Sequence, residues 1–296
     1  MPMKNAPSPG GARKGGHLQR ILFASDLTAY SDRAFDRSVM LAKEHEATLR
    51  ILHVVDSSLL LPQFVKQDIR EAKARLEREI RESGADKRFE VSVKASSGEA
   101  DKAIVEEASV MQTDLIVMGL ADYATFSAVF LGTTIDRVVR GAGCPVLTVK
   151  TRPRRNYGSI VVAVDQGEPS RHALEFALRI FPNARFTVIH IDEEPSAEAG
   201  KAAKSGDPEI RHQIEDMVRA RCAATGQPSP GAPDGPTLII KSGRAEELLQ
   251  EEIARLDPEL VVLGTHGRTG VPRMFLGSVA ETLLGLLPRD MLVVRA

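Results

Sequence analysis

The chain has 296 residues, of which 43% are hydrophobic, and this length suits two domains of about 140 residues, each with its own core. Its 39 Lys and Arg residues are balanced by 40 Asp and Glu residues, so no excess of cations favours nucleic acid as a partner. The two cysteines form no zinc-ligand motif, and no stretch approaches the ~18 apolar residues of a membrane span, so we expect a metal-free, cytoplasmic protein without membrane contact.

Residues 1–17 are rich in Gly, Pro, Lys and Arg and contain no apolar run, which predicts a disordered tail. Beyond the tail, short β-branched apolar runs alternate with amphipathic stretches, a pattern typical of βαβ units around a parallel sheet. In the first half, strands are predicted over 20–25, 48–55, 89–94, 114–118 and 146–149, and helices over 31–46, 67–82 and 99–111. A basic linker with one proline is predicted over 151–157.

The second half repeats this order of elements. Strands are predicted over 159–164, 185–191, 237–241, 260–263 and 291–294, and helices over 170–180, 208–223 and 245–256. Individual residues also correspond: Asp26 matches Asp165 at an offset of 139 (165 minus 26), and Gly119 matches Gly264 at an offset of 145 (264 minus 119). The repeat predicts two tandem Rossmann-like α/β domains over 18–150 and 158–296, each a five-stranded parallel sheet with helices on both faces.

The fourth strand of the second half ends in a glycine-spaced loop. Two residues separate Gly264 from Gly267, and nine residues separate Gly267 from Gly277, which opens the last helix together with Ser278. Glycine permits positive-φ turns and leaves no Cβ between the backbone and a ligand, while the first amides of a helix attract anions. The spacing therefore predicts a polyphosphate site at the carboxyl ends of the strands. The loop also supplies cationic groups at His266, Arg268 and Arg273.

The pattern Gly-x2-Gly-x9-Gly-Ser after a fourth strand resembles the signature of ATP-binding members of the universal stress protein family, and each half resembles one family domain over nearly its whole length. The resemblance implies that Asp165 and the backbone at Ile191 hold adenine, while the glycine loop and Ser278 hold ribose and phosphates. ATP, with Mg²⁺ left open, would be bound by Ala163, Asp165, Ile191, Gly264, His266, Gly267, Arg268, Gly277, Ser278 and Val279. The resemblance also implies that the two halves form an internal pseudo-dimer joined through their fifth strands. Whether two chains form a homodimer is left open.

The first half departs from this pattern. Gly119 is followed by Leu120-Ala121-Asp122, so a carboxylate stands at the position of the second glycine. The loop over 123–131 contains no Lys, Arg or His, although Gly132 and Thr133 still open a helix. Because a like charge and lost donors weaken anion binding, we predict at least ~10-fold weaker ATP binding by the first domain.

Several polar residues have competing interpretations. His53 and His190 occupy equivalent strand positions among apolar neighbours, which favours packing over ligand binding. For Asp26 a helix cap is favoured, and for Asp165 an adenine contact is favoured over a cap. The acidic run that begins at Asp192 is interpreted as solvated rather than as a metal site.

No Gly-x4-Gly-Lys loop, Gly-x-Ser-x-Gly elbow or carboxylate dyad is present, so we predict no catalytic residues. An ATP-binding regulator of stress adaptation, with its nucleotide held mainly by the second domain, is the favoured interpretation. Two alternatives stay open. One is a slow ATP hydrolase or phosphotransfer protein in which His266 orients water or accepts phosphate, and the other is an interaction scaffold that binds no nucleotide.

Overall fold

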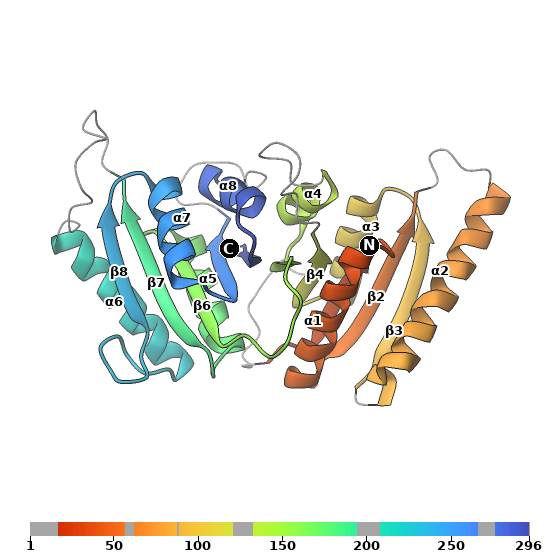
Figure 1. The fold of residues 1–296 in the computed structure, drawn as a ribbon, viewed down its shortest axis with the longest axis horizontal. Helices are drawn as coiled ribbons and strands as arrows, with labels where there is room; N and C mark the ends of the chain where they lie inside the picture. The colour runs from red at the N-terminus through yellow and green to blue at the C-terminus, as the bar shows by residue number, and fades with distance from the viewer. Residues whose placement is uncertain are drawn as a thin grey trace, which may run out of the picture.

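The computed structural model describes residues 17–56, 62–87, 89–120, 133–193, 208–265 and 276–295. The first half contains β1 (Arg20–Ser25), α1 (Ala29–His45), β2 (Thr48–Val55), α2 (Pro62–Ser83), the short 3-10 helix η1 (Ala85–Lys87), β3 (Val91–Ser97), α3 (Ala100–Met111), β4 (Leu115–Gly119), α4 (Thr133–Gly141) and β5 (Val146–Val149). The second half contains β6 (Ser159–Val164), α5 (Glu168–Ile180), β7 (Arg185–Asp192), α6 (Pro208–Thr225), β8 (Thr237–Ser242), α7 (Ala245–Leu256), β9 (Leu260–Gly264), α8 (Ser278–Leu286) and β10 (Asp290–Val294). The predicted succession of strands and helices is confirmed in both halves (Figure 1).

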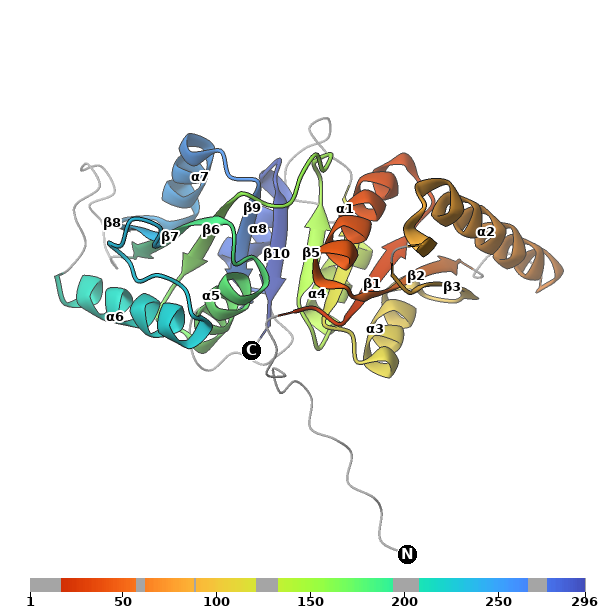
Figure 2. The ribbon, with the colours of Figure 1, turned by 90° about the horizontal axis from the view of Figure 1, so that it is seen from below.

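The ten strands form one sheet in the order β3-β2-β1-β4-β5-β10-β9-β6-β7-β8. Neighbouring strands are parallel within each half. β5 and β10 instead pair antiparallel at the centre, with Leu292 opposite Leu147 (Figure 2). The fifth strands therefore join the two Rossmann-like halves into the expected internal pseudo-dimer.

The core lies on both faces of this sheet because successive strand side chains point in opposite directions. Ile21 and Phe23 of β1 face a cluster that includes buried side chains of α1, α2, α5 and α6. Leu22 and Ala24 face a second cluster that includes side chains of α3, α4, α7 and α8. Each cluster contains residues of both halves, so the two halves share their packing across the β5–β10 pair.

Some boundaries differ from the sequence-based prediction. α2 begins at Pro62, five residues before the predicted start, because a proline in the first helical turn loses no intrahelical hydrogen bond. β3 covers Val91–Ser97 rather than 89–94, and it lies at the edge of the sheet, where only β2 specifies its register. No helix in the part of the chain that the structure describes is long and apolar enough to cross a membrane.

The predicted linker ends in a packed residue. Tyr157 is buried, its ring is T-shaped against Phe181, and the Arg37 guanidinium carbon lies 3.7 Å from the ring centroid. The Tyr157 hydroxyl donates a 2.6 Å hydrogen bond to Asp290 Oδ2. The connection between the halves is thus fixed to α1 and to the start of β10.

Candidate functional site

A pocket of about 530 Å³ lies at the carboxyl ends of β6, β7 and β9 in the second half. The chain passes from β6 to β7 on one side and places β9 on the other side, so this is the switch point where an open parallel sheet leaves a crevice. Seven of the ten predicted site residues line it: Ala163, Asp165, Ile191, Gly264, Gly277, Ser278 and Val279. The other three, His266, Gly267 and Arg268, lie outside the described residues.

The β9 side of the pocket is formed by the N-terminus of α8. Gly277 is the N-cap residue, with extended backbone (φ −62, ψ 149), and its N–H donates to Thr265 O at 2.8 Å. The first bonded turn begins with Glu281 N donating to Gly277 O at 2.9 Å. The amides of the first helical turn have no intrahelical acceptor, and Ser278, Val279 and Ala280 of this turn line the pocket. This wall suits an anion, and the Ser278 hydroxyl adds a donor.

The β6 and β7 side of the pocket carries hydrogen-bond acceptors. Asp165 follows β6, and Asp192 and Glu193 lie at the end of β7. Within the described residues, no group of three His, Cys, Asp or Glu side chains is placed to hold a metal ion. The pocket is therefore polar in a defined direction, with carboxylate acceptors at one end and helix amides at the other. It fits a molecule with amine or hydroxyl donors at one end and an anion at the other.

Asp165 and Asp26 differ in how far their carboxylates are occupied. Within the described residues, the Asp165 carboxylate accepts one hydrogen bond, from Gly167 N at 2.8 Å. Asp26 Oδ1 accepts three, from Thr28 N at 2.9 Å, Thr28 Oγ1 at 2.7 Å and Ser31 Oγ at 2.5 Å. Burial is the largest single influence on the pKa of Asp26 and raises it, but the hydrogen bonds from Ser31 and Thr28 together hold the pKa below its usual value. The hydrogen bonds of Asp26 Oδ1 are thus all made within the turn between β1 and α1.

The predicted helix-cap role of Asp26 has a different geometry from the one expected. The N-cap residue of α1 is Thr28 and that of α5 is Gly167, so each aspartate lies two residues before its helix cap. Each closes the turn between strand and helix by accepting from the backbone amide two residues later. In the second domain this turn leaves Asp165 at the pocket wall.

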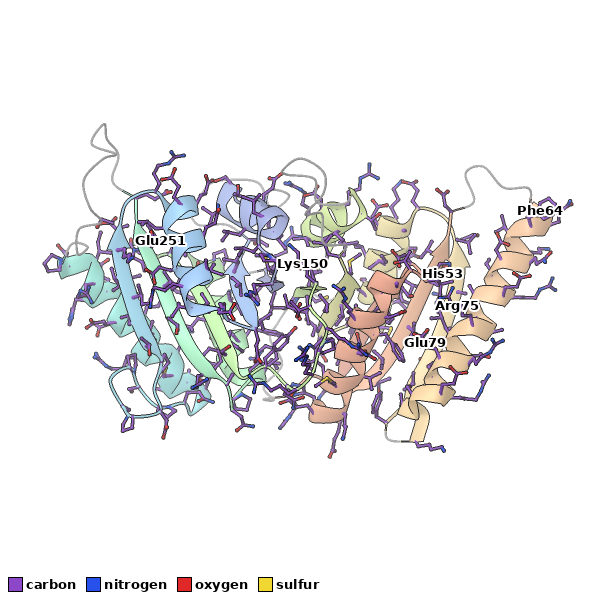
Figure 3. The ribbon with its side chains drawn as sticks, viewed as in Figure 1. His53, Phe64, Arg75, Glu79, Lys150 and Glu251 are labelled. Atoms are coloured by element: carbon purple, nitrogen blue, oxygen red, sulfur yellow. The ribbon has the colours of Figure 1, made fainter. Side chains whose placement is uncertain are left out.

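His53 and His190 each form a hydrogen bond from one strand to the end of the neighbouring strand, from β2 to β1 and from β7 to β6. His190 Nδ1 lies 2.9 Å from Val164 O, and His53 Nδ1 lies 2.8 Å from Ser25 O. Because a carbonyl only accepts, Nδ1 carries the proton in both rings. His53 is labelled in Figure 3 near the end of β2. These bonds agree with a packing role, although the buried His190 also lines the pocket.

The reason for Gly264 differs from the one predicted. Its φ is not positive, so it does not provide a left-handed turn. A Cβ at this position would lie 2.7 Å from Pro169 C and 2.8 Å from Ser170 N. Glycine is required here because β9 ends against the backbone of the first turn of α5, which shapes the pocket floor.

Apolar residues of the pocket were not foreseen from the sequence. Ile210 comes from α6, and Ala245 and Leu249 come from α7, and all three face the same pocket as Ile189 and Leu263 of the strands. Nothing in the local spacing of α6 and α7 distinguishes these positions from other core positions. They add apolar surface to the pocket from helices on opposite faces of the sheet.

In the first half, the described residues stop at Leu120 and resume at Thr133. The predicted differences at Asp122 and Gly132 therefore lie outside the described residues. The weaker binding expected of the first domain stays a prediction.

Comparison with known proteins identifies the chain's relatives. Residues 17–150 and 156–295 each match the model of the Universal stress protein family. The chain belongs to this family. It is 28% identical over 155 residues to a universal stress protein of Methanocaldococcus jannaschii, covering 48% of this chain and 88% of that protein. It is 27% identical over 207 residues to universal stress protein E of Escherichia coli, covering 66% of this chain and 64% of that protein.

Solved structures of the family share the two-domain fold. A universal stress protein from Archaeoglobus fulgidus superimposes with a TM-score of 0.74 at 18% identity, over 93% of this chain and 98% of that chain. A structure from Pseudomonas aeruginosa described as a putative universal stress protein gives a TM-score of 0.63 at 22% identity, over 95% and 94% of the two chains. The similarity in architecture therefore covers both halves.

Proposed function

We propose that this universal stress protein family member binds ATP in the pocket of its second domain and acts in the cytoplasm as a nucleotide-responsive regulator of stress adaptation. The observation that carries the proposal is the polarity of the pocket, with acceptors on β6 and β7 facing the N-terminus of α8. Adenine offers an amine donor, ribose offers hydroxyl donors, and the phosphates offer the anion.

In this proposal each wall has one task. Ala163, Asp165 and the backbone at Ile191 receive the adenine, with the apolar side chains of α6 and α7 against the ring. Gly277, Ser278 and Val279 receive the phosphates at the helix N-terminus. Gly264 keeps β9 close to α5, and the predicted contacts of His266, Gly267 and Arg268 complete the phosphate side.

Regulation follows from where the ligand lies. The loop between Thr265 and Leu276 links β9 to α8, and its two ends are joined by the hydrogen bond from Gly277 N to Thr265 O. We propose that phosphate contacts along this loop change the surface that partners meet.

Gly277→Asp tests the site without unfolding it. Aspartate is favoured over glycine at a helix N-cap, so the substitution stabilises α8 while it places a carboxylate where phosphate would bind. Gly277→Asn is the matched control, because it has the same shape and capping ability without the charge. We expect wild type to bind about one ATP per chain, and Gly277→Asp to bind at least ~10-fold more weakly than Gly277→Asn.

The measurement is isothermal titration with ATP, together with identification of any nucleotide that copurifies. Thermal unfolding of each variant shows that the fold is retained. Equal ATP affinity in wild type and Gly277→Asp would exclude this pocket as the nucleotide site.

A further inference from the structure

The two halves exchange cationic side chains across their junction. Lys150 follows β5 of the first half, and its Nζ donates to Leu284 O and Leu287 O of the second half, at 2.6 Å each. Arg295 follows β10 of the second half, and its Nη1 donates to Arg140 O at 2.6 Å and Ala142 O at 3.0 Å in the first half. Each half therefore caps the C-terminal end of the other half's last helix, α8 or α4. Lys150 is labelled at the centre of Figure 3, where the halves meet.

The sequence of α8 creates a need for this cap. Its last carbonyls lack intrahelical donors, and the residue four positions after Leu284 is Pro288, which has no N–H to offer. Lys150 Nζ supplies the missing donor, and its positive charge also complements the negative end of the helix dipole. Because Lys150 is only 5% exposed, this interaction is weakly screened by water.

Lys150 is itself held in place. Its backbone N–H donates to Asp290 Oδ1 at 2.9 Å, and its carbonyl accepts from Arg33 Nη1 at 2.5 Å. The ammonium group thus projects from a fixed backbone at the sheet centre toward α8. Its position depends on first-domain strand β5 and helix α1.

The first half also contacts α8 near its other end. Arg140 of α4 lies with Nη2 3.3 Å from Glu281 Oε2, in the first turn of α8, while its Nε is 2.7 Å from Asp136 Oδ1. Glu281 is 43% exposed at its side chain, so this pair is the weaker of the two connections. α8 has 9 residues and is about 14 Å long, so a contact at its C-terminus orients its N-terminus as well.

We propose that Lys150 of the first domain is a positioning residue for the nucleotide site of the second domain, because it holds α8 with its first-turn amides directed at the phosphates. The inference rests on the proposed function. It gives the first domain a task that requires no nucleotide of its own. By thermodynamic linkage, nucleotide bound at α8 in turn strengthens the junction of the two halves.

The test compares two full-length variants. Lys150→Met keeps the length of the side chain and removes the donor to α8, whereas Arg295→Met removes the equivalent donor to α4. Both remove a cation from the same junction, so a general loosening of the protein affects both. We expect Lys150→Met to weaken ATP binding by about tenfold and Arg295→Met to change it by less than about twofold.

Adenosine separates positioning from loss of the whole pocket, because it has no phosphate to meet α8. Adenosine binding, measured by competition, is expected to change less than about twofold in Lys150→Met, and Lys150→Arg is expected to restore ATP affinity. If Lys150→Met does not fold, Lys150→Gln, which retains one donor group, replaces it, and its ATP and adenosine affinities are compared with those of wild type in the same way.

The inference is overturned if wild type binds ATP and Lys150→Met binds it equally well, or if ATP and adenosine weaken in parallel. Wild type that binds no ATP, or Gly277→Asp that binds like wild type, overturns the proposed function first and this inference with it. The two failures are therefore distinguishable.

Discussion

His45 is a buried residue at the end of α1 with an unusual environment. It is 7% exposed, and neither ring nitrogen has a hydrogen-bond partner within the described structure. Its ring lies T-shaped to His17, with 5.7 Å between centroids. Burial, and to a lesser extent the nearby His17, lowers the pKa of His45 from 6.5 to about 4. The environment of His45 therefore favours the neutral imidazole over the charged one.

This environment predicts a dependence of stability on pH. Between pH 6.5 and 4 the unfolded chain protonates His45 and the folded chain does not. The free energy of unfolding is therefore highest above pH 6.5, as far as His45 is concerned, and it decreases as the pH falls toward 4. The difference between 6.5 and 4, at ~1.4 kcal/mol per pH unit, amounts to about 3 kcal/mol.

His45→Phe removes the titrating group and the unsatisfied ring nitrogens. We expect its free energy of unfolding to match or exceed that of wild type at pH 7.5, and its advantage to grow by about 3 kcal/mol toward pH 4. Urea unfolding of both proteins across this range measures the difference. A constant difference at every pH would show that His45 titrates normally.

Gly264 gives a second prediction at the scale of one residue. A methyl group at this position would approach the Pro169 and Ser170 backbone to less than 3.0 Å, so strand or helix must shift. We expect Gly264→Ala to lower the free energy of unfolding by about 1–3 kcal/mol in nucleotide-free protein. Gly277→Asn serves as the control, since a Cβ there meets Thr265 O at 3.4 Å. If Gly264→Ala is as stable as wild type without nucleotide, the close approach is not what requires glycine.

At the scale of elements, the segment after β5 is hydrogen-bonded to the start of β10. Asp290 at the start of β10 is fully buried, and its Oδ1 accepts from Lys150 N, Thr151 N and Thr151 Oγ1 at 2.9 Å each. Its Oδ2 accepts from the Tyr157 hydroxyl. Burial, followed by the neighbouring Asp290 charge, raises the pKa of Tyr157 well above its usual value, so the hydroxyl stays a donor.

Tyr157→Phe removes this hydrogen bond and keeps the ring against Arg37 and Phe181. A bond to a buried carboxylate contributes about 1.5–3 kcal/mol, so we expect the free energy of unfolding to fall by about 2 kcal/mol. Chemical unfolding measures the change. Tyr157→Leu, which also removes the ring, is expected to lose more, and a Tyr157→Phe variant as stable as wild type would contradict the role of the hydroxyl.

At the scale of the whole molecule, the two halves share one sheet and two core clusters that cross the β5–β10 pair. We therefore expect calorimetric unfolding to show one cooperative transition rather than one for each domain. ATP is expected to raise the midpoint of the entire transition, because ligand that binds only the folded state stabilises whatever unfolds with its site. Two separate peaks, with only one shifted by ATP, would show that the halves unfold independently.

Much of the fold followed from local patterns. The ranges of β1, β2, β5, β6 and α7 match the prediction residue by residue, because buried parallel strands and amphipathic helices differ in period and composition. The edge strand β3 and the start of α2 were less accurate, since β3 is specified on one side only and Pro62 extends its helix beyond the apolar pattern. Seven predicted site residues meet in one pocket for the same reason: carboxyl ends of parallel strands share one edge.

The sequence by itself determined the duplication, the five parallel strands of each half and the glycine motif, because strand period, helix period and helix-opening residues are properties of a few neighbouring positions. Only the tertiary structure decided that Lys150 donates to the carbonyls of α8, that the backbone of α5 leaves no space for a Cβ at Gly264, and which residues of α6 and α7 line the pocket. These contacts join residues far apart in the chain, and packing rather than local backbone chemistry brings such residues together.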